Sequence, residues 1–148
     1  MNIKTIMSLF ILPAFLLATV WFFISVSSYF DPLDWCRIGI NGDIMNGNEK
    51  TIKAALGLLK KTDMAAYKDL CRWVDRIGEK NCIIADQLID AKRFQEGWDL
   101  PGCYVNGTKT IYIKPTKSES PETIEERAWA LKHYSAFSKT FWEEHGRQ

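Results

Sequence analysis

Two histidines and four cysteines are the side chains of this 148-residue chain whose types most readily support chemistry. His133 and His145 stand 12 positions apart near the carboxyl end, on one predicted helix. At about 1.5 Å per residue they lie roughly 18 Å apart, too far to share a metal ion whose ligand bonds are about 2 Å long. The sequence contains neither a G-x-S-x-G elbow nor a phosphate-binding glycine loop. We therefore predict no catalytic residue, no metal ligand and no cofactor.

Carboxylate pairs are the next candidates, because two carboxyl groups divide the acid and base roles in glycoside hydrolysis. The Glu125–Glu126 and Glu143–Glu144 pairs are adjacent on a predicted helix, where neighbouring side chains diverge by about 100°. Asp86 and Asp90 would share one helical face, but Lys92 beside them favours an ordinary charged surface. The pattern predicts solvated surfaces rather than a carbohydrate-cleaving site.

The cysteines predict structural disulfides. Their gaps are far wider than the closely spaced pairs of zinc sites, and small domains outside the cytoplasm gain stability from such bonds. Three pairings are open, of which we favour Cys36 with Cys71 and Cys82 with Cys103.

An apolar stretch without any charge, from Thr5 to Phe30, is long enough to cross a bilayer as one helix. Lys4 precedes it and Asp31 follows, and positive charge favours the cytoplasmic side. We therefore expect an uncleaved signal-anchor over residues 1–30 in the cell membrane, with the amino terminus cytoplasmic and the rest extracytoplasmic. A signal peptide cleaved near residues 26–28 is the alternative, but the apolar stretch exceeds the roughly 7 to 15 residues of such signals.

The charges nearly cancel, with 19 Lys and Arg against 18 Asp and Glu. A phosphate backbone is bound by clustered, uncompensated cations. The composition therefore argues against nucleic acid and leaves the membrane and a protein or envelope component as expected partners.

The part outside the membrane reads as one α+β domain. Turn residues make 31–48 a connector, and a mostly helical domain with one β-hairpin follows over 49–148. Its first helix begins at Glu49 and is interrupted at Thr62–Asp63. A second helix carries an apolar stripe from Met64 to Ile77 and ends at Gly78.

The carboxyl half contains clearer signals. A helix is expected over residues 84–94, although a buried strand is also compatible with its first residues. Asn106–Gly107 suits the turn of a hairpin between Cys103–Val105 and Thr108–Ile113. Ser120 and Pro121 start a final helix that runs to about His145. Its expected apolar face comprises Ile124, Ala128, Leu131, Tyr134, Phe137 and Phe141.

The order of these elements resembles the minimal core of extracytoplasmic zincin-type metallopeptidases, in which the long helix carries H-E-x-x-H. The resemblance covers residues 49–148 and extends to small, cysteine-containing, membrane-anchored bacterial proteins of unknown function. Where the motif should stand, the chain reads Lys132-His133-Tyr134-Ser135-Ala136-Phe137. Tyr134 replaces the glutamate that activates water and Phe137 replaces the second metal ligand. The resemblance therefore implies at most a degenerate or unorthodox peptidase.

Aromatic residues are the distinctive feature that remains, because exposed Trp and Tyr are enriched in binding surfaces. Trp129 lies off the best apolar face of the final helix, near His133 and followed by Trp142. We predict that these three residues contribute to a binding surface, although tryptophans that roof a small core would give the same pattern. The functional hypothesis is a non-catalytic, membrane-anchored domain that binds a partner protein or envelope component.

Overall fold

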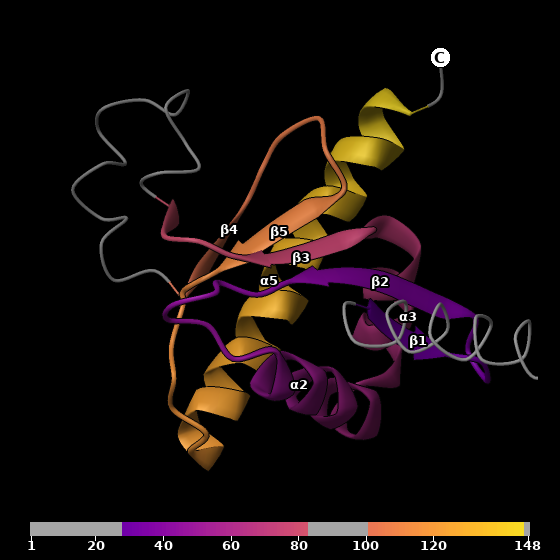
Figure 1. Cartoon of the computed structure of the whole chain (residues 1–148). Coiled ribbons are helices and arrows are strands. Elements are labelled where there is room, and N and C mark those ends of the chain that lie inside the picture. Colours follow the sequence, from indigo (N-terminus) through magenta and orange to yellow (C-terminus); the bar gives the residue numbers. More distant parts are fainter. Residues whose placement is uncertain (1–27, 83–100, 147–148) are drawn as a thin grey trace, which may run out of the picture.

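The computed structural model describes residues 28–82 and 101–146 of the chain. Along these residues two strands, two helices, three strands and a final helix follow one another (Figure 1). In chain order they are β1 (Ser28–Asp31), β2 (Cys36–Asn41), α2 (Glu49–Thr62), α3 (Met64–Trp73), β3 (Arg76–Glu79), β4 (Gly102–Tyr104), β5 (Thr110–Ile113) and α5 (Pro121–His145).

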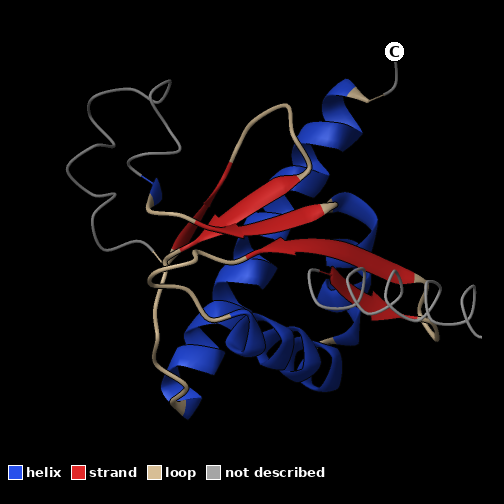
Figure 2. Ribbon diagram, viewed as in Figure 1, coloured by secondary structure: helices blue, strands red, loops and turns tan. Residues whose placement is uncertain are grey.

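The strands form one sheet with the order β1-β2-β3-β5-β4. β2, β3 and β5 run parallel in its centre, while β1 and β4 pair antiparallel at the two edges. The parallel pair β2 and β3 needs a crossover connection, which α2 and α3 provide. α5 contacts both of these helices as well as β4 and β5, so the helices pack on one face of the sheet (Figures 1 and 2). The result is a two-layer α+β domain.

The core lies between these two layers. Ile38 and Ile40 of β2 point toward the helices and are at most 1% exposed, whereas Arg37 and Asn41, which precede and follow them, are exposed. Ile40 stands beside Ile77 of β3, which stands beside Ile111 of β5. Each such buried isoleucine contributes about 1.5 to 3 kcal/mol relative to leaving it in water. This alternation fixes which face of the sheet the helices cover.

Side-chain caps set the starts of the helices. Asn48, Asp63 and Ser120 each accept a hydrogen bond from a backbone N–H two or three residues further on. Pro121 follows the last of these caps at the first helical position, where its missing N–H costs nothing. The predicted helix starts at Glu49, after Asp63 and after Ser120 are confirmed.

Two disulfides brace the domain. Cys36 of β2 is bonded to Cys71 of α3, and Cys82 is bonded to Cys103 of β4. This is the pairing favoured from the sequence. The bonds join residues 35 and 21 positions apart, and in the chain-entropy model loops of this size stabilise a domain by about 3 to 4 kcal/mol each.

The predicted second helix ends too late. The helix stops at Trp73, and Val74 is extended, with φ −128° and ψ 120°. Ile77 belongs to strand β3 rather than to a helix. Val74 and Ile77 are both fully buried, as the apolar stripe required, but they reach the core from an extended chain.

The predicted connector over residues 31–48 also missed a strand. Its first turn signal is real, because residues 32–35 form the turn between β1 and β2. Cys36–Asn41 is nevertheless strand β2, which lies between β1 and β3 in the sheet. Gly39 and Asn41 resemble turn residues in the sequence, but they occupy the outward positions of an alternating strand. The domain therefore has a five-stranded sheet in place of a single hairpin.

The hairpin near residue 106 is confirmed, since β4 and β5 pair antiparallel around Gly107, which has φ +76°. Of the predicted anchor over residues 1–30, Ser28 to Phe30 belong to strand β1, and the rest lies outside the described residues. The predicted helix over 84–94 lies outside them too. Among the helices that are described, none has the length and apolar character needed to cross a bilayer.

Candidate functional site

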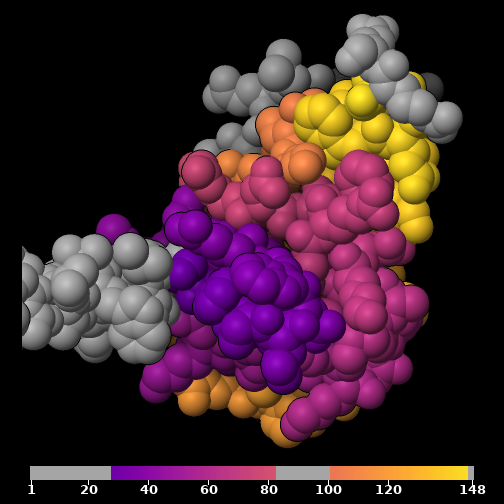
Figure 3. All heavy atoms as spheres, turned by 90° about the vertical axis from the view of Figure 1, so that its right-hand side faces the viewer, coloured from indigo at the N-terminus to yellow at the C-terminus, as the bar shows by residue number. Residues whose placement is uncertain are grey.

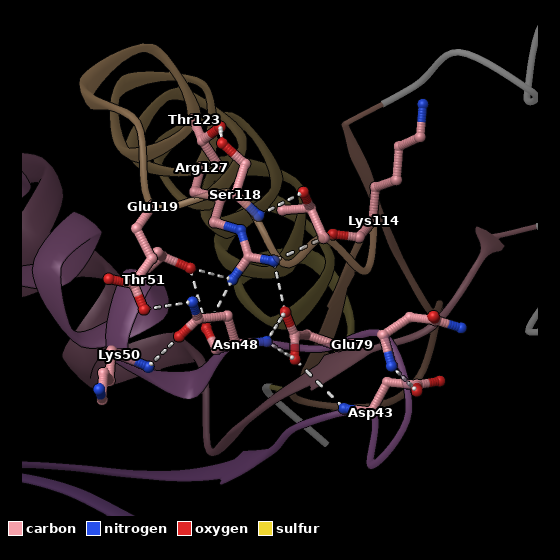
Figure 4. Close-up of polar contacts among 12 residues, drawn as sticks. Asp43, Asn48, Lys50, Thr51, Glu79, Lys114, Ser118, Glu119, Thr123 and Arg127 are labelled. Carbon is pink, nitrogen blue, oxygen red and sulfur yellow. Dashed lines mark hydrogen bonds and ion pairs between the residues drawn. The ribbon is translucent and has the colours of Figure 1, made fainter.

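The carboxyl ends of β2 and β3 form the edge at which open sheets with parallel strands usually bind ligands. In this protein Glu79, the last residue of β3, lies at that edge and is 2% exposed. Arg127 of α5 is 3% exposed and forms an ion pair with it through Nη2 and Oε1 (Figure 4). A buried charge pair therefore occupies the place where a ligand would be expected.

Arg127 connects α5 with three other parts of the chain (Figure 4). Its Nη1 donates to the carbonyl oxygen of Asn48 at 3.0 Å and to the hydroxyl of Thr51 at 2.7 Å. Its Nη2 donates to Glu79 and to the carbonyl oxygen of Lys114, the latter at 3.3 Å. The guanidinium thus links the start of α2 with the ends of β3 and β5.

Glu79 holds the loop that leads from β2 into α2. The backbone N–H groups of Asp43 and Asn48 donate to its Oε2 at 3.2 and 2.9 Å. A Cβ atom added to Gly47 would lie 2.0 Å from the same oxygen, so only glycine allows this approach. The start of a helix attracts anions, and at the start of α2 this anion is the carboxylate of Glu79. We conclude that the Glu79–Arg127 pair is structural, because its charges are directed at protein atoms.

His133 does not lie in a metal-binding arrangement. It is exposed on α5, where its ring stacks on Trp129 with 4.7 Å between ring centroids and 12° between planes. In the described parts of the chain, no cluster of three or more His, Cys, Asp or Glu is placed to hold a metal ion.

Trp129, His133 and Phe137 form a continuous exposed surface, which we call the aromatic row. The three residues are four positions apart on α5, so they lie along one side of the helix. Phe137 contacts the edge of His133, with ring centroids 5.1 Å apart and planes at 77°. Trp129 and Phe137 are each 52% exposed. The prediction that Phe137 faces the core is therefore wrong, while Tyr134 is buried as predicted.

Trp142 does not belong to the aromatic row. It follows Trp129 by 13 residues, about 20 Å along a helix and on a different side of it. It lines a shallow pocket of about 580 Å³ between α3, the turn before β5 and the end of α5. In this pocket Arg72 lies over the ring of Trp73 at 5.2 Å, and Lys109 lies over Trp142 at 5.8 Å. The predicted binding surface is therefore divided between two places.

Glu79 and Arg127 are the most buried ionic residues of the described chain, and the sequence analysis did not predict their role. Arg127 did carry a signal, because it falls among the apolar positions Ile124, Ala128 and Leu131 of the final helix. A charge on an apolar stripe indicates a buried partner of opposite sign. The identity of that partner, Glu79, has no local signal.

A second polar cluster supports the β1–β2 hairpin. Asp31 Oδ2 accepts a hydrogen bond from the Tyr67 hydroxyl at 2.8 Å and pairs with Lys60. The hydrogen bond from Lys60 is the main reason why the pKa of Asp31 is lowered, and the Tyr67 hydroxyl adds to the effect. Burial in turn raises the pKa of Tyr67, so that its hydroxyl remains a donor. Lys60 also contacts Asp34 at 2.7 Å.

Comparison with known proteins gave no match to a family model, to a curated protein or to a solved structure. The function of these surfaces therefore has to be inferred from their own geometry and chemistry.

Replacing Arg127 should strongly destabilise the domain. Arg127→Met keeps much of the side-chain volume but leaves the Glu79 carboxylate buried and unpaired, which typically costs about 3 to 5 kcal/mol. Urea unfolding of the full chain measures this loss. The matched control on the same helix is Lys139→Met, which removes an exposed pair with Asp69 and should cost at most about 1 kcal/mol. Equal losses in the two variants would contradict a structural role for the buried pair.

Asp31 should make the stability of the domain sensitive to acid. Its pKa is lower in the folded chain than its ordinary value of 3.8, so its contribution is complete above that value and disappears as acid protonates the folded carboxylate. The difference in unfolding free energy between wild type and Asp31→Asn should therefore shrink as the pH falls from about 5 to about 2. A difference that stays constant over this range would rule out the ionised form of Asp31 as its source.

Proposed function

We propose that this protein is a non-catalytic binding domain that a single apolar amino-terminal segment holds on the outer side of a membrane. Its aromatic row would bind a partner protein or an envelope component. The uncharged stretch from Thr5 and the two disulfides support the location, because disulfides persist mainly in oxidising compartments.

The aromatic row is the observation that carries the proposed activity. Trp129 and His133 are stacked on each other rather than packed into the core, and Phe137 extends them along the helix. Rings already ordered in the free protein lose little conformational entropy when a partner covers them. Exposed aromatic groups of this kind supply the dominant contacts of many interfaces.

The competing function is a degenerate or unorthodox zincin-type peptidase, for which His133 would be the first metal ligand. Full-length protein purified without chelators is expected to contain no stoichiometric zinc, because Tyr134 and Phe137 supply neither a metal-bound nitrogen nor a general base. Elemental analysis of wild type and His133→Ala tests this expectation. One zinc per chain in the wild type, lost in the variant, would favour the peptidase.

The binding proposal predicts contact-dependent cross-links at the aromatic row. Lys132 lies beside the row with its side chain 55% exposed, so a membrane-impermeant amine cross-linker applied to the native membrane should join it to a bound partner. Trp129→Ala and Phe137→Ala should reduce partner affinity by roughly thirtyfold, the effect of losing about 2 kcal/mol at a hot spot. The readout is the amount of cross-linked adduct recovered.

The matched control for this experiment is Ile44→Ala, which removes a fully exposed apolar side chain from the loop after β2. It should leave the adduct unchanged. Equal adduct in all variants would remove the aromatic row from the proposal, and a chain that the impermeant reagent cannot reach would contradict its location.

A further inference from the structure

The turn between β1 and β2 presents the largest exposed apolar side chains near the start of the described chain. Leu33 is 85% exposed and Trp35 is 87% exposed, while Phe30 of β1 is 59% exposed. We call these three residues the hairpin tip. Figure 3 looks onto this side of the molecule, and the indigo spheres of the β1–β2 hairpin lie at the centre of the view.

A hydrogen bond and a disulfide fix the backbone of the hairpin tip. The N–H of Leu33 donates to Asp31 Oδ1 at 3.1 Å, and Asp31 is itself only 8% exposed. Directly after the turn, Cys36 is bonded to Cys71 of α3. The exposure of the apolar side chains is therefore built into the fold.

Trp35 occupies its position against the preference of its backbone. Its φ is +51°, in the left-handed region that glycine and asparagine adopt more easily than a bulky residue. Its ring also gains little from the core, since nearly all of it is exposed. Neither local geometry nor internal packing favours a tryptophan at this position.

We infer that the hairpin tip inserts into the interface of a lipid bilayer, the one that holds the amino-terminal segment; this inference rests on the proposed membrane location. The uncharged stretch that begins at Thr5 continues without a break into β1 and ends at Phe30, which is exposed. β1 has four residues and is only about 13 Å long. When β1 lies along the membrane surface, Ser28 at its start and the hairpin tip at its end are both at that surface.

The chemistry around the tip suits this partner. Tryptophan is enriched at the boundary between lipid chains and water, where one end of its ring is apolar and the other is hydrated. Arg37 on the neighbouring strand stands directly opposite Phe30 and is exposed, so it can meet anionic headgroups when the tip is inserted.

The test uses the full chain reconstituted in phosphatidylcholine–phosphatidylglycerol vesicles, with and without bromine on the acyl chains, and measures tryptophan emission. Bromine quenches only indoles that reach the lipid chains. Trp35→Phe should lower the bromine-dependent loss of emission by roughly one half, because it removes one of the two indoles that the proposal assigns to the lipid, the other being Trp21 of the uncharged stretch. The matched control is Ile44→Asp, which changes an exposed apolar residue in the loop at the other end of β2 and should leave that loss unchanged.

A second variant tests the tip without removing its reporter. Leu33→Asp, at a site that is almost fully exposed, should lift Trp35 out of the lipid and lower its quenching to a similar extent. Equal quenching in wild type, Trp35→Phe and Leu33→Asp would overturn the inference, while flotation of all three with the vesicles would leave the membrane location intact. Wild-type chain that does not float would refute the location itself. The inference would also be overturned if the wild-type chain formed a dimer that Trp35→Phe dissociates without any change in quenching. The hairpin tip would then contact a second copy of the chain.

Discussion

The buried pair between Glu79 and Arg127 is the constraint on which the arrangement of this domain depends. A charge buried without a partner is so costly that β3 and α5 have to meet at this one point. Further hydrogen bonds of the pair then fix the loop before α2 and the end of β5. One ion pair therefore sets the position of α5 relative to the sheet, and with it the side of α5 that remains exposed.

This use of charge has a functional consequence. In many open sheets with parallel strands the carboxyl edge is left free for a ligand, and a helix start beside it provides N–H groups for an anion. Here the carboxylate of Glu79 accepts the N–H of Asn48 at the start of α2, and Gly47 allows it to approach closely. The aromatic row of α5 and the hairpin tip, in contrast, leave large apolar side chains exposed on the outer surface.

The sequence predicted the features that depend on neighbouring residues. Caps such as Asp63 and Ser120, and the turn around Gly107, act within a few positions and were visible. The boundary between α3 and β3 was hidden because Val74 and Ile77 fit a helical stripe while their burial is equally compatible with a strand. The Glu79–Arg127 pair joins residues 48 positions apart, and local patterns carry no information on such a contact. The same holds for Phe137, whose exposure follows from how α5 is set against α2 and α3.

The bond between Cys82 and Cys103 has a consequence for how the protein withstands proteases. It closes a covalent ring around the intervening residues, since the two sulfur atoms join positions 21 apart. A single peptide cut inside that ring would leave both fragments attached to each other, and β3 would keep its place beside β5 through the sheet. Such a nicked molecule would migrate as one species until a reductant separated it. In an environment rich in proteases the domain would thus remain whole after damage that would divide a chain without this bond.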